Sequence, residues 1–82
     1  MAVKLLDVVA LINDLPEYNL RRGQVGTVVG ILADGKAFEV EFSDTEGRTY
    51  ESVGLRPQQI MLLYYTPIKT QPKFSAEQTV NV

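Results

Sequence analysis

The fold of this chain is decided by residues 20–42, which read LRRGQVGTVVGILADGKAFEVEF. Valine, threonine and isoleucine dominate the first half, and such β-branched residues favour strands. Gly26 and Gly30 interrupt that run, as glycines do where a strand bends sharply or another backbone approaches closely. Asp34-Gly35 is a tight-turn signal, and residues 38–42 beyond it alternate strictly between apolar and acidic. The stretch therefore predicts two antiparallel strands of a small barrel.

The flanking sequence predicts three further short strands around a long first loop. The expected strands are residues 7–12, 24–32, 37–42, 48–53 and 60–65. A helix is the competing interpretation of the first, because its apolar positions also fit helical spacing, but its valines and the Asn13-Asp14-Leu15-Pro16 stop favour a strand. Residues 13–23 form the loop, and Pro57 indicates one 3₁₀ turn before the last strand.

This order of elements predicts an all-β fold, an SH3-like five-stranded small barrel. We expect the barrel domain to span residues 1–65 and to be followed by a C-terminal tail at residues 66–82. The predicted inward-facing residues are Val8, Ala10, Val25, Val28, Ile31, Phe38, Val40, Phe42, Tyr50, Leu55, Ile60 and Leu62.

The apolar pattern also predicts a register for the hairpin of residues 37–42 and 48–53. Its facing pairs are Phe42 with Arg48, Val40 with Tyr50 and Phe38 with Ser52. A slip of one residue would turn every side chain over and bury the Glu51 carboxylate beside Val40. This register turns Glu39, Glu41 and Glu51 outward as one acidic face, with Glu39 directly opposite Glu51.

The composition removes the residue types on which most catalysis depends. The 82 residues suit one domain and include no cysteine and no histidine, so disulfides, thiolate chemistry and the usual zinc sites are not expected. A nucleophile–base pair would need unusual Lys or Tyr chemistry. The turn after Asp44 lacks the later ligands of a calcium loop. We therefore expect no enzyme, no catalytic residues, no metal and no cofactor.

Charge and hydropathy restrict the expected partners and location. The net charge of −2 and the pI near 4.9 count against nucleic acid, whose binders carry a basic excess. The longest apolar run, Ile60–Tyr65, is far shorter than the ~20 residues of a membrane span. The N-terminal residues lack a small-residue cleavage site. The expectation is a cytoplasmic protein that does not interact with a membrane.

Several motifs, in order along the chain, resemble a small bacterial family that is common in cyanobacteria and catalogued as domain of unknown function 4926. They are LDVVAL at residues 6–11, LPE at 15–17, LRRGQVGTVV at 20–29, FEVEF at 38–42 and GRTY at 47–50. The resemblance covers about residues 5–63 and implies a compact stand-alone barrel with no established activity. Residues 23–31 also resemble, more weakly, the KOW motif of ribosomal and transcription-factor barrels, although fold similarity does not transfer function.

Candidate contact residues come from the first loop and the turn before the last strand. Arg21 and Arg22 suit an acidic partner, because a guanidinium forks onto carboxylates and phosphates; otherwise they are solvated and pair with Asp14 or Glu17. We expect Tyr18 and Arg56 to flank a groove with that loop, in the place where SH3-type domains bind peptides. A proline-rich ligand is not expected, because the chain has no tryptophan shelf.

Two function hypotheses follow from these residues. The first is a non-catalytic accessory module that binds another protein, such as the product of a neighbouring gene, through Tyr18, Arg21, Arg22 and Arg56. The acidic face of Glu39, Glu41 and Glu51 is either a contact for a basic partner or a solubility surface. The last strand and the tail are the candidate surface for a homodimer. The second hypothesis is a KOW-like contact with RNA or the ribosome through Arg21, Arg22 and Lys36.

Overall fold

The computed structural model describes residues 2–64, which form an antiparallel sheet of five strands. The strands are β1 (Val8–Leu11), β2 (Val25–Leu32), β3 (Ala37–Ser43), β4 (Thr49–Leu55) and β5 (Ile60–Leu63). Three of the four connections contain a short 3₁₀ turn: η1 (Pro16–Tyr18) between β1 and β2, η2 (Ala33–Gly35) between β2 and β3, and η3 (Pro57–Gln59) between β4 and β5. The expected tail at residues 66–82, and Tyr65 at the end of the expected last strand, lie outside the described residues.

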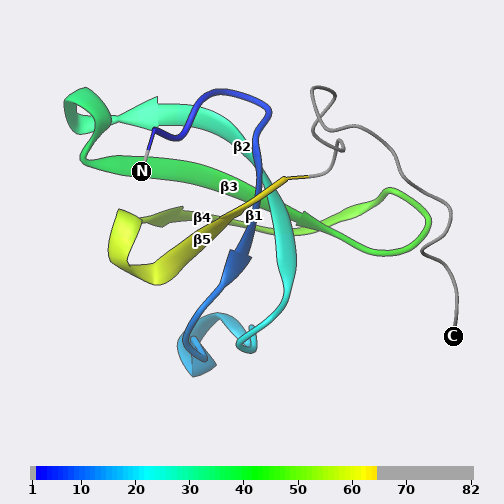
Figure 1. Cartoon of the computed structure of the whole chain (residues 1–82). Coiled ribbons are helices and arrows are strands. Elements are labelled where there is room, and N and C mark those ends of the chain that lie inside the picture. Colours follow the sequence, from blue (N-terminus) through cyan, green and yellow to red (C-terminus); the bar gives the residue numbers. More distant parts are fainter. Residues whose placement is uncertain (1, 65–82) are drawn as a thin grey trace, which may run out of the picture.

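The strand order β4-β3-β2-β1-β5 confirms the predicted all-β fold class, including the 3₁₀ turn before the last strand. The long strand β2 curves from a pairing with β1 into a pairing with β3, so that β1 and β5 cross over the β3–β4 hairpin (Figure 1). The sheet does not close, because β4 and β5 stand at its two ends. The barrel is therefore open along two free strand edges.

The core lies between the crossing strands and takes side chains from all five of them. Its members are Val9, Leu11, Leu15, Leu20, Val28, Phe38, Val40, Phe42, Val53, Leu55 and Ile60. Gly26 permits the close approach of β2 to β3: a methyl group there would lie 2.7 Å from Val40 Cγ1 and 2.8 Å from the carbonyl oxygen of Glu41. The predicted reason for this glycine, close approach of another backbone, is thus confirmed.

Part of the predicted core is wrong. Val25, Ile31 and Tyr50 are 44%, 46% and 47% exposed. In β1, the residues of the core cluster are Val9 and Leu11, whereas Val8 and Ala10 lie on the other face of the sheet. Ala10 is nevertheless buried, as predicted, at 7% exposure. The stretch is apolar at every position from 8 to 12, so alternation carries no information about which face is buried.

The predicted register of the β3–β4 hairpin is also wrong, by three residues. The observed pairs are Phe38 with Leu55, Val40 with Val53 and Phe42 with Glu51. Strand β4 extends to Leu55, two residues beyond the prediction, and an irregularity between Phe42 and Ser43 shifts the pairing near the turn. The longer strand places Val53 and Leu55 in the core, and this pairing turns Tyr50 outward.

Candidate functional site

The β1–β2 loop, residues 12–24, is held in place by its own apolar side chains. Leu15 and Leu20 are both buried in the core and pair with each other through backbone hydrogen bonds. The 3₁₀ turn η1 lies between them and is followed by its C-cap residue, Asn19. Asn19 has a left-handed backbone conformation with a φ of 59°, which asparagine adopts more readily than most residues. The loop is therefore tethered at both ends of η1, and Tyr18, which is 41% exposed, projects from the tethered segment.

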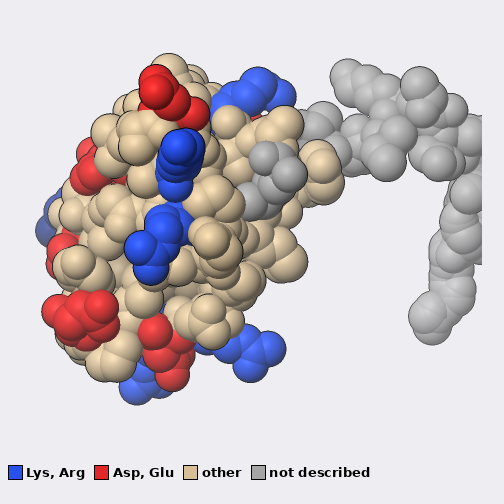
Figure 2. Space-filling model, turned by 90° about the vertical axis from the view of Figure 1, so that its left-hand side faces the viewer, with Lys and Arg blue, Asp and Glu red and all other residues tan. Residues whose placement is uncertain are grey.

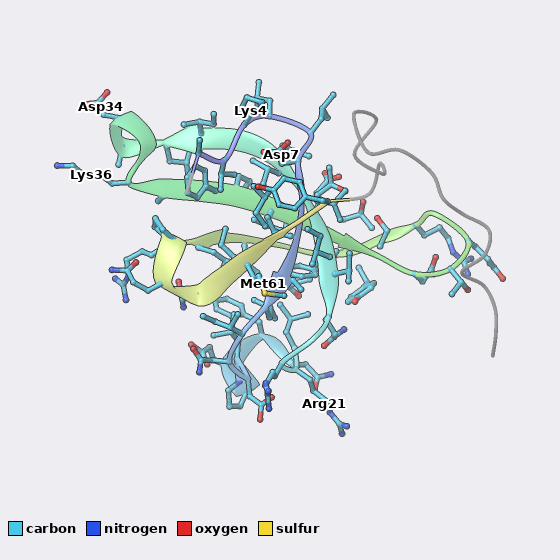
Figure 3. The ribbon with its side chains drawn as sticks, in the orientation of Figure 1. Lys4, Asp7, Arg21, Asp34, Lys36 and Met61 are labelled. Atoms are coloured by element: carbon cyan, nitrogen blue, oxygen red, sulfur yellow. The ribbon has the colours of Figure 1, made fainter. Side chains whose placement is uncertain are left out.

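Arg21 and Arg22 follow this tether, and their backbone amides are bonded while their guanidinium groups face solvent. The amide of Arg22 donates to Asp14 Oδ1 at 2.8 Å, and the amide of Arg21 donates to Gln24 Oε1. Among residues 2–64 neither guanidinium takes part in an ion pair, so the expected pairing with Asp14 or Glu17 is absent there. Figure 3 shows the Arg21 side chain extending outward from the lower end of the molecule.

Gln24 connects this loop end to strand β4. Its Nε2 donates to the hydroxyl oxygen of Tyr50 at 2.7 Å, while its Oε1 accepts the Arg21 amide. Exposed Val25 begins β2 at the same place. We call Arg21, Arg22, Val25 and Tyr50 the arginine–tyrosine surface. The sequence prediction placed Tyr50 in the core and so did not identify it as a contact residue. Val53 and Leu55 could have corrected this, because they lie on the face of β4 opposite to Tyr50 and form the stronger apolar pair.

The other predicted contact residue, Arg56, belongs to a different turn. It is the N-cap residue that precedes η3, and its amide donates to Gln59 Oε1 at 2.8 Å. The amide of Ile12 donates to the Gln59 carbonyl oxygen at 3.1 Å, so the start of the first loop lies beside η3. Within the described chain, however, no hydrogen bond or ion pair joins Arg56 to Arg21 or Arg22.

A small hollow at the first loop is lined by only one of the four predicted contact residues. It has a volume of about 220 Å³ and is lined by Asp14, Pro16, Asn19, Leu20 and Arg21. Arg21 is the one predicted contact residue in its lining; Tyr18, Arg22 and Arg56 lie elsewhere. The structure therefore does not bring the four predicted residues into this hollow.

The predicted acidic face is divided between two sides of the sheet. Glu39 and Glu41 share one side, where they accept hydrogen bonds from the hydroxyls of Ser52 and Thr49. Glu51 faces Phe42 across the β3–β4 ladder, and Glu39 faces Gly54. The prediction that Glu39 stands opposite Glu51 is wrong for the same reason as the register.

The basic side chains do not gather into one field. Lys36 follows η2, at the end of the molecule opposite Arg21 (Figure 3). On the face seen in Figure 2, blue and red side chains are interspersed and separated by uncharged residues. Arg21 and Arg22 therefore do not form a common basic patch with Lys36.

The described residues provide few features typical of reactive sites. Residues 2–64 contain no group of three His, Cys, Asp or Glu side chains placed to hold a metal ion, and no buried polar or charged side chain. Hydrogen bonds from the backbone of Arg48, and then of Glu46, lower the pKa of Asp44 in the β3–β4 turn. No helix among these residues has the length and apolarity needed to cross a membrane.

Comparison with known proteins gives one match. The model of a family described as "Domain of unknown function (DUF4926)" matches residues 5–62, which is most of the chain and nearly all of the described sheet. Searches of curated proteins and of solved structures give no match.

Proposed function

The chain belongs to the DUF4926 family, and we propose that it is a non-catalytic module that binds another protein through its arginine–tyrosine surface. The observation that carries this proposal is the link from the Arg21 amide through the Gln24 side chain to the Tyr50 hydroxyl. It joins an exposed aromatic ring to the backbone of the loop end that carries Arg21 and Arg22, whose guanidinium groups make no ion pair within residues 2–64.

Tyrosine and arginine suit this role on physical grounds. Both are enriched among the side chains that dominate protein–protein binding, because each combines a large apolar area with hydrogen-bonding atoms. The side-chain entropy lost on binding is smaller when a ring is already held in place, and Gln24 holds Tyr50. A surface fixed in the free protein therefore binds more tightly than the same side chains on a loose loop.

The surface also indicates the chemistry of the partner. Val25 and the Tyr50 ring offer apolar contact area, and Arg21 and Arg22 offer paired donors for carboxylates. The partner we propose is a protein segment with an apolar anchor next to Asp or Glu residues. A cytoplasmic accessory role beside the product of a neighbouring gene, as expected from the sequence, remains part of this proposal.

A KOW-like contact with RNA receives less support from the geometry. That hypothesis relied on Arg21, Arg22 and Lys36 together, and Lys36 lies at the other end of the molecule (Figure 3). Phosphate binding draws its affinity from several cations acting along one surface. The protein hypothesis needs only Arg21, Arg22 and the Tyr50 ring, and the Gln24 hydrogen bonds that link Tyr50 to the Arg21 amide support it.

Affinity capture with matched variants tests the proposal. The bait is the full chain, compared with a triple Arg21→Ala, Arg22→Ala, Tyr50→Ala variant and with Arg48→Ala as the control for loss of an exposed arginine elsewhere. We expect a partner that the wild type and Arg48→Ala retain equally and that the triple variant loses by about tenfold or more. Equal retention by all three baits would contradict the proposal. Retained RNA that is released between about 50 and 200 mM salt would support phosphate binding instead.

A further inference from the structure

The two free edges of the open sheet differ in how they are protected. Strand β4 carries the charged Glu51, and its Thr49 and Ser52 hydroxyls are bonded to glutamates of β3. Residues 60–64 at the other edge read Ile-Met-Leu-Leu-Tyr and contain no charge and no proline. Natural edge strands usually avoid edge-to-edge pairing by means of charges, prolines or bulges. Strand β5 has none of these devices.

An apolar groove runs beside this unprotected edge. Its volume is about 480 Å³, and its lining consists of Ala2, Ile12, Ile60, Met61, Leu62 and Tyr64. Two of these side chains are largely in solvent, Tyr64 at 86% and Met61 at 51% exposure. Figure 3 shows Met61 near the centre of the molecule, on the strand that crosses in front. Within residues 2–64, β5 therefore pairs on one side only, with β1, and the Met61 and Tyr64 side chains beside its other edge remain largely in solvent.

We propose that a second copy of this chain occupies the groove, with the two β5 strands paired antiparallel about a twofold axis at Leu62. This inference uses a different surface from the arginine–tyrosine surface and does not depend on the proposed function. An antiparallel strand can pair with itself, so that each contact made by one copy is repeated by the other.

The sequence of β5 is complementary to itself in this register. Leu62 faces Leu62 of the second copy, Met61 faces Leu63, and Ile60 faces Tyr64. Each cross-strand pair is uncharged, so no like charges face each other and no charge is buried. A charged strand such as β4 would oppose the same arrangement.

The exposed Tyr64 gains the most from the pairing. In the proposed register its ring lies over Ile60 of the second copy, at the end of the groove where Ile12 is part of the lining. The most exposed aromatic ring of one copy therefore fills the apolar groove of the other, and the second copy does the same in return. The strand pair is short, below the standard interface of about 800 Å² per partner, so we expect a Kd on the order of 10–100 µM.

Sedimentation equilibrium of the full chain from about 10 µM to about 1 mM tests the proposal, since this range spans the expected Kd. The wild-type mass should rise from one chain towards two. Tyr64→Lys should raise the Kd by at least about tenfold, because both copies lose the contact. Ile31→Lys, a matched change of an exposed apolar residue on the distant hairpin, should leave the Kd unchanged. A wild type that stays a single chain throughout would overturn the proposal.

A single engineered cysteine tests the register itself. The chain has no cysteine of its own, and directly facing antiparallel residues have Cα atoms about 4.5–5.5 Å apart, within disulfide range. Oxidised Leu62→Cys should form a covalent dimer in high yield, and Ile31→Cys should not. Equal yields for the two variants would contradict the proposed axis.

Amide hydrogen exchange distinguishes a second copy from other occupants of the edge. Protection of the residue 60–64 amides should increase with protein concentration if a second copy binds there. Protection that is the same at both ends of the concentration range would indicate that residues 65–82 of the same chain occupy the groove, and would overturn the proposal. It would also be overturned by protection that appears only after another protein is added.

Discussion

The β1–β2 loop and the β3–β4 turn each place arginines among carboxylates, but they use the charges differently. In the turn, Arg48 pairs with Asp44 through Nε at 3.3 Å and with Glu46 through Nη2 at 2.7 Å. In the loop, Asp14 accepts a backbone amide, and the guanidinium groups of Arg21 and Arg22 make no ion pair within the described chain. Asp44 thus binds both the backbone of its turn, through Oδ1, and the Arg48 side chain, through Oδ2. Asp14 accepts the Arg22 amide but pairs with neither arginine side chain of its loop within the described chain.

The largest expected effect on stability concerns the buried Leu15–Leu20 pair, which holds the β1–β2 loop against the core. Leu20→Ala removes a side chain that is only 2% exposed and leaves a cavity beside Leu15. We expect a loss of about 2–5 kcal/mol in the free energy of unfolding, measured by urea denaturation. Tyr18→Ala in the same loop is the control and should stay within about 0.5 kcal/mol. A small loss for Leu20→Ala would show that the loop is not held by the core.

The next largest effect on stability concerns the Asp14 carboxylate, which accepts a hydrogen bond from the loop backbone. Asp14→Ala deprives the Arg22 amide of its acceptor, and we expect the free energy of unfolding to fall by about 0.5–1.5 kcal/mol. Asp14→Asn keeps an acceptor oxygen at the same place and should lose less. If both variants unfold at the same denaturant concentration as the wild type, the bond to Arg22 does not contribute to the loop.

A smaller effect should appear at the β3–β4 turn when the pH is lowered. The backbone hydrogen bonds to Asp44 hold its pKa in the folded protein below the unfolded value of about 3.9. The resulting stabilisation is therefore complete above that unfolded value and is lost as the pH falls through the folded pKa. Thermal melting between about pH 6 and pH 2 should show the wild type more stable than Asp44→Asn at the upper end, with the difference shrinking in acid. A difference that stays constant over this range would contradict the assignment.

The smallest effect on stability should come from the residues that we assign to binding. Arg21→Ala with Arg22→Ala removes two exposed guanidinium groups that make no ion pair within residues 2–64. The melting temperature should therefore change little, corresponding to about 0.5 kcal/mol or less. Partner capture should fall in the same variant. A marked loss of stability would show that these arginines serve the fold, as Arg48 does.

The sequence predicted the positions of the strands and turns, but it did not predict for every strand which face is buried. Alternation at residues 38–42 and the turn signals located β3, both of its neighbours and the 3₁₀ turn at Pro57 to within two residues. It did not determine which face of β1 is buried, because both faces are apolar there. The turn itself gave no sign of the irregularity between Phe42 and Ser43, and this irregularity moved Glu51 and Tyr50 to opposite sides from those expected.

How much of the candidate site could be predicted depended on the same uncertainty about strand faces and register. Arg21 and Arg22 were identifiable as charges beside a glycine in a long loop, whatever the register. Tyr50 was not, because its exposure depends on pairing between β3 and β4 and its position depends on a hydrogen bond to Gln24, 26 residues earlier. Leu15 and Leu20 were recoverable in principle, since two leucines that enclose a short polar turn are the pattern of a tethered loop.

The pairing of β1 with β5 has a consequence for how the chain acquires its structure. Val8 pairs with Leu63, so the first and last strands of the sheet meet across nearly the whole described sequence. The β2–β3 and β3–β4 hairpins close over short loops, and the entropy lost in closing a loop grows with its length. During synthesis the hairpins should therefore form first, while β1 waits with one side unpaired. The described sheet is complete only when β5 has been synthesised, and until then the side of β1 that pairs with β5 stays open.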